Sequence, residues 1–168
     1  MYYIAMVILG IDPGYATVGF GVISQQGNKC KAIDYGIIST PKTDSLPTRL
    51  AKISQCIDEL MEKYKPDAIA IEELFFQKNQ KTAISVAEAR GAILLTVHKK
   101  NKNLYEYTPL QIKQAMTGYG RAEKCQIQHM VTLLLGLSKI PKPDDAADAL
   151  AVALTHAQSG RFAELSRV

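Results

Sequence analysis

Apolar residues near the start of the chain recur in the way that is typical of β-strands. The pattern covers residues 4–11, 17–24 and 31–39. Residues 12–14 and 26–28 separate these segments, and their Pro, Gly, Asp and Asn content is typical of turns. The pattern therefore predicts three consecutive strands that form an antiparallel meander.

Helical periodicity follows the meander and then alternates with short strands. Apolar positions recur at helical spacing between residues 46 and 64, where Pro47 suits a first helical turn and Pro66 forces an end. The remaining pattern predicts strands at 68–72 and 104–108 and helices at 80 to about 100, 110–116, 124–136 and 144 to about 158. This order predicts an α/β fold of three layers with a mixed sheet. We expect one domain over residues 1–158 and a disordered C-terminal tail over 159–168.

The length, charge and cysteine content agree with a cytoplasmic enzyme. A chain of 168 residues is about one domain long and buries roughly 70% of the surface that it would expose unfolded. The net charge of +4 is mild, but a cluster of acids would leave the rest of the surface more basic. Three widely spaced cysteines indicate reduced thiols, and we expect no signal peptide and no membrane span.

Four carboxylates lie in contexts that point to a common centre. Asp12 and Glu72 each end an apolar run, and Asp145 and Asp148 lie near the start of an alanine-rich helix. Carboxylates that gather in a folded protein repel one another and raise each other's pKa. A divalent cation such as Mg²⁺ compensates this repulsion and prefers oxygen ligands. The four residues therefore predict a metal site.

Each acid taken alone also has a simpler interpretation. Strand-end acids are common in turns, and acids at a helix start are common as caps, which we favour for Asp144. The spacing does not separate the pair Asp144 and Asp148 from the pair Asp145 and Asp148, because both share a helix face. Neighbouring strand residues point to opposite faces, so only one of Glu72 and Glu73 is expected to join the cluster.

The motifs in combination resemble those of the RuvC-type Holliday junction resolvases, collinearly over nearly the whole chain. They are Gly10-Ile11-Asp12-Pro13-Gly14, Gly19-Phe20-Gly21, Ile71-Glu72-Glu73-Leu74-Phe75-Phe76 with Lys78-Asn79, Ala87-Glu88-Ala89-Arg90-Gly91, Arg121-Ala122-Glu123-Lys124 and Asp144-Asp145-Ala146-Ala147-Asp148-Ala149-Leu150-Ala151. The resemblance implies a ribonuclease H-like three-layer fold with a five-stranded mixed sheet flanked by helices. It implies a homodimer that resolves four-way DNA junctions by paired symmetric nicks in recombination and repair. A branch-migration complex of the RuvA and RuvB type is the implied partner.

The resemblance also implies which acids form the site. Asp12, Glu72, Asp145 and Asp148 fall on the family's four acidic positions, and Asp144 and Glu73 do not. We expect two Mg²⁺ ions in each active site, with Mn²⁺ able to replace them. Asp12 would bridge both ions. One ion would activate water, and the other would stabilise the leaving 3′ oxygen.

Basic and aromatic residues supply candidates for DNA contact. Lys113 and Lys124 match basic positions of the family, and Arg121, Lys78 and Lys81 are further candidates for phosphate binding. Phe75 and Phe76 follow the strand that carries Glu72, and exposed aromatics there could stack on unpaired bases. The resemblance favours Phe75 for this role. Core packing is the alternative for each phenylalanine, and a solvated surface is the alternative for each lone lysine.

The helix over 80–100 carries a row of small residues. Ala83, Ala87 and Gly91 are spaced four apart and would let another helix approach closely, and the matching region of the family lies at its dimer interface. Packing of this row against the protein's own sheet is the alternative.

Other chemistries fit the sequence less well. The chain has no second Cys/His pair for a zinc site, no nucleophile elbow and no phosphate loop of the GxxxxGK[ST] type. An actin-like ATPase would need two comparable domains. A nuclease for structured RNA and a junction-binding protein without cleavage remain as alternatives.

Overall fold

The computed structural model describes residues 5–74 and 80–168, without the side chains of residues 80, 81, 161 and 162. Its strands are β1 (Met6–Asp12), β2 (Thr17–Gln26), β3 (Lys29–Ser39), β4 (Ala68–Glu72) and β5 (Leu104–Tyr107). Its helices are α1 (Leu46–Tyr64), α2 (Gln80–Lys99), α3 (Pro109–Thr117), α4 (Lys124–Leu134), α5 (Asp144–Ser159) and the 3₁₀ helix η1 (Gly160–Ser166). Every helix and strand expected from the sequence is present, with boundaries that differ by at most a few residues.

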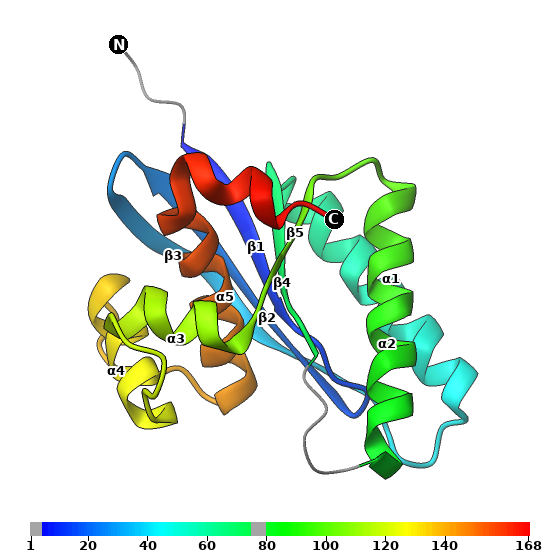
Figure 1. Cartoon of the computed structure of the whole chain (residues 1–168). Coiled ribbons are helices and arrows are strands. Elements are labelled where there is room, and N and C mark those ends of the chain that lie inside the picture. The colour runs from blue at the N-terminus through cyan, green and yellow to red at the C-terminus, as the bar shows by residue number, and fades with distance from the viewer. Residues whose placement is uncertain (1–4, 75–79) are drawn as a thin grey trace.

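The strands form one mixed sheet in the order β3-β2-β1-β4-β5. β1, β2 and β3 pair in antiparallel fashion, which confirms the meander, whereas β4 pairs in parallel with both β1 and β5. Helices α1 and α2 lie on one face of the sheet, and α3, α4 and α5 lie on the other (Figure 1). The α/β architecture of three layers with a five-stranded mixed sheet is therefore confirmed.

Local sequence signals explain where helix α1 begins and ends. The Ser45 hydroxyl accepts a hydrogen bond from the Thr48 backbone N–H, and Pro47 lies in the first turn, where its missing N–H costs nothing. The helix ends at Tyr64, and the cap residue Lys65 adopts a left-handed conformation with φ of 47° before Pro66. These signals place the expected helix at the observed residues.

Alternation along the central strands divides the core into two halves. Leu9 and Ile11 of β1 pack in the cluster beneath α1 and α2, whereas Ile8 packs in the cluster beneath α3, α4 and α5. In β4, Ile69 and Ile71 face α1 and α2, and the alternating alanines of the strand face α5. By the same period of two, Asp12 and Glu72 lie on the α5 face.

Glycines on this face let α5 lie unusually close to the sheet. A Cβ atom at Gly19 would lie 2.0 Å from the Asp145 carbonyl oxygen, and one at Gly10 would lie 2.2 Å from the Ala149 carbonyl oxygen. Gly21 is covered by Leu150 of the same helix. Helix α5 is therefore seated where any larger strand residue would push its backbone away.

Helix α2 turns its row of small residues away from the sheet. Ala89, Ile93 and Val97 are fully buried against the sheet, whereas Ala87 and Gly91 are exposed. A Cβ atom at Gly91 would meet no atom within 4 Å. The interpretation that this row packs against the protein's own sheet is therefore wrong for these two positions.

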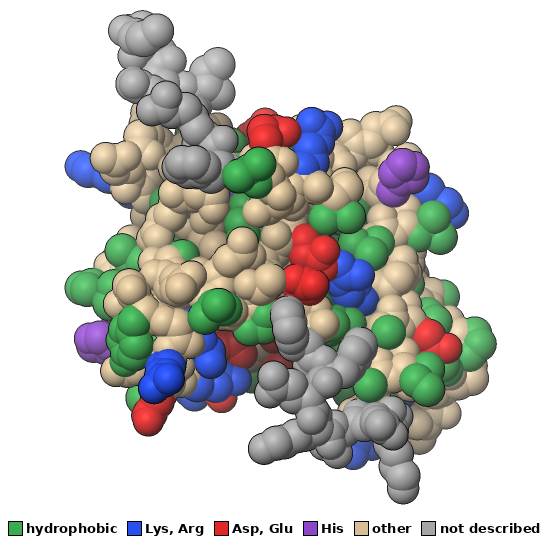
Figure 2. All heavy atoms as spheres, viewed as in Figure 1, with side chains coloured by type: hydrophobic (Ala, Val, Ile, Leu, Met, Phe, Trp, Pro, Cys, Tyr) green, Lys and Arg blue, Asp and Glu red, His purple; other side chains and the backbone are tan. Residues whose placement is uncertain are grey.

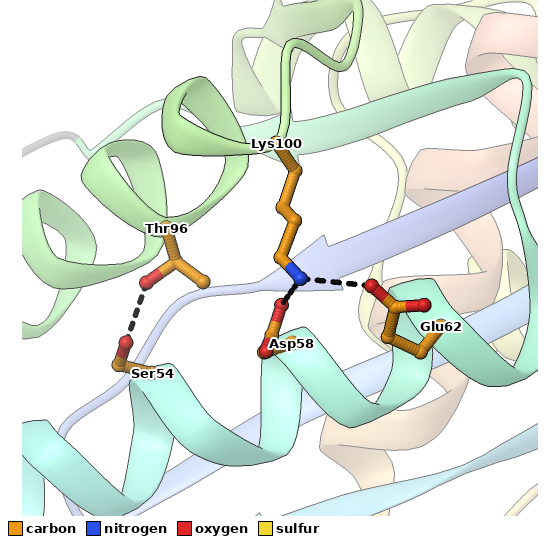
Figure 3. Close-up of polar contacts among 5 residues, drawn as sticks. All are labelled: Ser54, Asp58, Glu62, Thr96 and Lys100. Atoms are coloured by element: carbon orange, nitrogen blue, oxygen red, sulfur yellow. Dashed lines mark hydrogen bonds and ion pairs between the residues drawn. The ribbon is translucent and has the colours of Figure 1, made fainter.

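Polar contacts join α1 to α2 across the outer end of their interface (Figure 3). The hydroxyls of Ser54 and Thr96 lie 2.7 Å apart. The Lys100 ammonium lies 2.9 Å from an Asp58 carboxylate oxygen and 2.8 Å from one of Glu62. Exposed pairs of this kind contribute little each, and the buried apolar residues hold the two helices on the sheet.

The last residues run alongside strand β5. Helix η1 follows α5 directly, and the Tyr105 hydroxyl donates to a Glu164 carboxylate oxygen at 3.1 Å. Tyr105 forms an antiparallel bridge with Arg167, and the Val168 N–H donates to the Leu104 carbonyl oxygen at 3.0 Å. The expected disordered tail instead has regular structure here. The division into a domain over 1–158 and a tail over 159–168 stays a prediction.

Candidate active site

The two strand-borne acids come together at one edge of the sheet. β1 and β4 are parallel neighbours with Ile11 opposite Ile71, so Asp12 and Glu72 both follow at the carboxyl ends of these strands. Both point to the α5 face. Helix α5 begins over this edge, because the Asp145 backbone lies on Gly19 and Gly19 pairs with Asp12.

Asp12 lies at the centre of the acidic group. Burial raises its pKa well above the usual value for aspartate, and the charges of Glu72, Asp148 and Asp145 raise it further. The Lys124 ammonium partly offsets this effect. The structure thus brings the four predicted acids close enough to repel one another, and it does so across three separate parts of the chain.

The pKa values of Glu72 and Asp148 are also raised, and burial is again the largest cause. Burial and the nearby Asp148 charge raise the pKa of Glu72 to about 7, against the opposing effect of Lys124 and Lys113. Burial also raises the pKa of Asp148, although a hydrogen bond and the charge of Lys124 counteract it. Carboxylates with raised pKa values in a common site are the environment in which a bound cation is most stabilising.

Lys124, the first residue of α4, supplies positive charge to the cluster. Its ammonium lies 2.9 Å from an Asp148 oxygen and 3.6 Å from an Asp144 oxygen. Burial lowers the pKa of Lys124, but the hydrogen bond and charge of Asp148 outweigh it, so the pKa is raised. Figure 2 shows basic and acidic side chains gathered at this end of the molecule, over α3, α4 and the start of α5.

A hollow of about 220 Å³ opens beside the acids. Glu72 and Asp148 line it together with Lys113 and Lys124. A larger hollow of about 570 Å³ lies between α1 and α2. Its charged lining residues are Asp58, Lys99 and Lys100, so it contains a single carboxylate. The smaller hollow is the candidate active site because it combines carboxylates of raised pKa with two ammonium groups.

The structure separates the site acids from their neighbours in sequence. Glu73 follows Glu72 but acts on Arg90 of α2, on the other face of the sheet. Asp144 is the first residue of α5, one position after the cap residue Pro143, and pairs with Lys142 at 2.7 Å. The expectation that Asp144 caps the helix is therefore wrong, because Pro143 occupies the cap position and the Lys142 ammonium binds the carboxylate.

The donor chemistry of the four acids fits a divalent metal. Among the described residues, no three His, Cys, Asp or Glu side chains converge closely enough to hold an ion as they stand. The Lys124 ammonium is bound to Asp148 and supplies part of the compensating charge. Carboxylate oxygens are the ligands that hard cations prefer, and the charges of Glu72, Asp148 and Asp145 all act on Asp12, so the residues present fit such an ion.

The candidate DNA contacts are placed unevenly. Lys113 and Lys124 line the hollow, and Arg121 is exposed in the turn before α4. Phe75, Phe76 and Lys78 lie outside the described residues, as does the side chain of Lys81 in the first turn of α2. The pairing of Lys124 with Asp148 was not expected, since nothing in the sequence signals which acid a distant lysine meets.

No helix in the described parts of the chain is both long enough and apolar enough to cross a membrane.

The sequence and fold match one family of proteins. The sequence model described as "Crossover junction endodeoxyribonuclease RuvC" matches residues 8–156. A protein of this name from Petrotoga mobilis is 60% identical over 151 residues, which is 90% of this chain and 93% of that protein. One from Alkaliphilus oremlandii is 54% identical over 163 residues, which is 97% of this chain and 99% of that protein.

A solved structure gives the same match in three dimensions. The structure described as Thermus thermophilus RuvC in complex with Holliday junction substrate is 33% identical, with a TM-score of 0.88 over 97% of this chain and 100% of that chain. The ribonuclease H-like form of the three layers is thereby confirmed.

Proposed function

Since the chain belongs to the RuvC family of crossover junction endodeoxyribonucleases and resolves Holliday junctions, we propose that Asp12, Glu72, Asp145 and Asp148 form the centre that cleaves the DNA. The observation that carries this proposal is the raised pKa of Asp12, which burial causes together with the charges of Glu72 from β4 and of Asp148 and Asp145 from α5. Such mutual repulsion is costly, and it is expected where a site is built to bind cations.

The reaction needs charge neutralisation and alignment more than covalent help from the protein. A phosphodiester is anionic and repels a hydroxide nucleophile, so groups that neutralise its oxygens lower the barrier. Nucleases of this family depend on a metal ion. We assign two Mg²⁺ ions to the four carboxylates, with Mn²⁺ as a substitute, and such a pair would activate water and stabilise the leaving 3′ oxygen.

The protein's own groups have separable tasks. Asp12 is the acid whose pKa the charges of the other three raise, so it would hold the metal together with them. Lys113 and Lys124 line the hollow and are placed to bind the phosphates of the strand that is cut. Release of Asp148 from its pairing with Lys124 frees that ammonium for a phosphate.

We further propose that the protein acts as a homodimer through the outer face of α2. Ala87 and Gly91 leave this face low, and Ile84 and Leu95 beside them are 69% and 54% exposed. The small residues allow a second helix to approach, and the exposed apolar side chains would be buried on contact. A two-fold pair of active sites suits a four-way junction, which is itself roughly two-fold symmetric.

Symmetric paired nicking, a partnership with a branch-migration complex of the RuvA and RuvB type and a cytoplasmic location remain predictions. So do the DNA contacts of Arg121, Lys78, Lys81 and Phe75. They are supported by the family to which the chain belongs.

The test is cleavage of a synthetic four-way DNA junction, a linear duplex and an RNA hairpin, each with and without Mg²⁺. We expect paired symmetric nicks in the DNA junction alone, and only with the metal. Asp12→Asn, Glu72→Gln, Asp145→Asn and Asp148→Asn should each abolish nicking.

Asp144→Asn is the matched control, because Asp144 neighbours Asp145 in sequence but pairs most closely with Lys142, at 2.7 Å, and less closely with Lys124, at 3.6 Å. It should still cut. An amide at any of the four positions that leaves nicking unchanged would remove that residue from the site, and cleavage of the RNA hairpin would redirect the proposal to structured RNA.

A further inference from the structure

Arg49 holds a buried charge that the cleavage chemistry does not use. It lies on the inner stripe of α1 with Ile53, Ile57 and Met61 and is only 5% exposed. A guanidinium is always charged at neutral pH, and burying it is costly unless the charge is compensated. The start of a helix is also the unfavourable end for a cation. Its place in an apolar stripe therefore calls for an explanation.

No acid among the described residues supplies that compensation. None of the ion pairs in this part of the chain includes Arg49. The guanidinium instead lies over the ring of Tyr15, 4.0 Å from its centre, in a cation–π contact. Its Nε donates to the Thr40 hydroxyl oxygen at 2.9 Å, and Nη2 donates to the Thr40 carbonyl oxygen at 3.4 Å.

Thr40 passes these contacts on to the turn that contains Tyr15. The Thr40 hydroxyl donates to the Tyr15 carbonyl oxygen at 2.6 Å, and the Thr40 N–H donates to the Ala16 carbonyl oxygen at 3.0 Å. Arg49 thus contacts the turn over 13–16 directly at the Tyr15 ring and, through Thr40, at the turn's backbone. Thr40 is itself 4% exposed, so water does not compete for these bonds.

The turn that Arg49 contacts follows Asp12 directly in the chain. β1 ends at Asp12, β2 begins at Thr17, and Asp12 pairs with Gly19 across the hairpin. Pro13 restricts the backbone immediately after Asp12, so a displacement of the turn is transmitted to the carboxylate rather than absorbed. Asp12 must also be held against three acids that repel it. The contacts of Arg49 with Tyr15 and Thr40 fix the turn and so resist this repulsion.

We propose that Arg49 is a positioning residue of the nuclease, whose contacts with Tyr15 and Thr40 hold Asp12 in the place that DNA cleavage requires. Arg49 acts through the turn and touches neither the metal nor the DNA. The inference rests on the proposed role of Asp12 as a metal-binding acid.

The test compares Arg49→Met and Tyr15→Leu with two conservative variants, Arg49→Lys and Tyr15→Phe. Single-turnover cleavage of the four-way junction is measured over a range of Mg²⁺ concentrations, and junction binding is measured in EDTA. We expect Arg49→Met to slow cleavage on the order of 10- to 100-fold, as for a small misplacement of a catalytic group, and to raise the Mg²⁺ concentration needed for half-maximal rate. Binding in EDTA should be unchanged.

The conservative variants separate positioning from mere presence of bulk. Tyr15→Phe keeps the ring under the cation and should cut at the wild-type rate. Arg49→Lys keeps a cation and a donor for Thr40 and should recover most of the activity. Tyr15→Leu keeps an apolar side chain but removes the ring, and it should slow cleavage with the same rise in Mg²⁺ requirement. It also serves if Arg49→Met does not fold.

Ser54→Ala is the stability control, since it removes the hydrogen bond to Thr96 on the outer side of the same helix (Figure 3). It should lower the melting temperature and leave the rate and the Mg²⁺ requirement alone. If Ser54→Ala slows cleavage as much as Arg49→Met, or if Arg49→Met cuts at the wild-type rate, Arg49 is only structural. Asp12→Asn in the same assay keeps the two proposals apart, because its retained activity would overturn the proposed site instead.

Discussion

Single residues of one chemical type differ in role here because of the side of the structure that they face. Glu72 and Glu73 are adjacent, yet Glu72 lines the hollow beside α5 while the charge of Glu73 acts on Arg90 of α2. Asp144 and Asp145 are also adjacent, and Asp144 pairs most closely with Lys142, at 2.7 Å, and less closely with Lys124, at 3.6 Å. The role of each acid therefore depends on the face of the sheet that its side chain lies on and on the cations near it, not on whether it is Asp or Glu.

Glu72 should make the stability of the metal-free protein depend on pH. Its pKa is raised from 4.5 to about 7, so its contribution is fully present below pH 4.5 and is lost as the pH rises towards 7. At 1.36 kcal/mol per pH unit the loss is roughly 3 kcal/mol. Urea unfolding in EDTA at a series of pH values measures it.

Glu72→Gln should reduce this loss, because a neutral amide has no proton to release. Saturating Mg²⁺ should also reduce it for the wild type. Parallel stability curves for wild type and Glu72→Gln would show that Glu72 does not carry the raised pKa.

Residues that follow a simple rule were predictable, and residues set by long-range contacts were not. Alternation places Glu72 and Glu73 on opposite faces, and the family resemblance selects Glu72 of the two. The pairing of Lys124 with Asp148 and the burial of Arg49 depend on which segments meet in space. An arginine in an amphipathic helix is ordinarily on its polar side, so the sequence carried no signal for Arg49.

At the scale of elements, the seating of α5 on the glycines of β1 and β2 is what carries its two acids to the strand ends. The helix is alanine-rich and almost wholly buried, from Ala146 to Ala157. Small residues on both surfaces bring the backbones together. The motif glycines could be read from the sequence, but the helix they receive could not, because α5 is far along the chain.

Gly19→Ala should therefore disturb the site as well as the fold. The new methyl group would meet the Asp145 carbonyl oxygen, a backbone atom that cannot rotate aside. We expect a loss of about 1–3 kcal/mol in unfolding free energy and slower junction cleavage, because the start of α5 must move. Urea unfolding and single-turnover cleavage measure the two effects.

Gly91→Ala is the matched control in open surroundings. It lies inside helix α2, on the proposed dimer face, with no atom of the same chain within 4 Å of the added Cβ, so in the monomeric Leu95→Glu background it should stabilise the fold by about 0.5–1 kcal/mol. Equal effects of the two substitutions would mean that close seating of α5 is not what Gly19 provides.

At the scale of the whole molecule, the outer face of α2 should decide the oligomeric state. Leu95→Glu places a charge in the proposed dimer interface and should give a monomer by sedimentation at micromolar concentration. Leu133→Glu is the control, because Leu133 is 66% exposed on α4, in the opposite layer. It should leave the dimer intact. A wild-type protein that sediments as a monomer would contradict the proposal outright.

Mg²⁺ should stabilise the whole fold, because it binds acids that repel one another only in the folded state. At one hundred times its dissociation constant a ligand adds about 2.7 kcal/mol of stability, and the melting temperature should rise accordingly. Asp12→Asn should raise the metal-free melting temperature and diminish the response to Mg²⁺. The idea fails if the wild type melts at one temperature with and without the ion.

The last residues, which lie beside β5, help to protect the protein from aggregation. An outermost strand with free N–H and C=O groups is a template on which other chains can add. Arg167 and Val168 occupy part of that template at β5, while β3 on the opposite border begins Lys29-Cys30-Lys31, whose charges repel an incoming strand. The two edge strands are thus protected in different ways: β3 by its charged side chains and β5 by pairing with the final residues. Removal of those residues would expose the edge of β5.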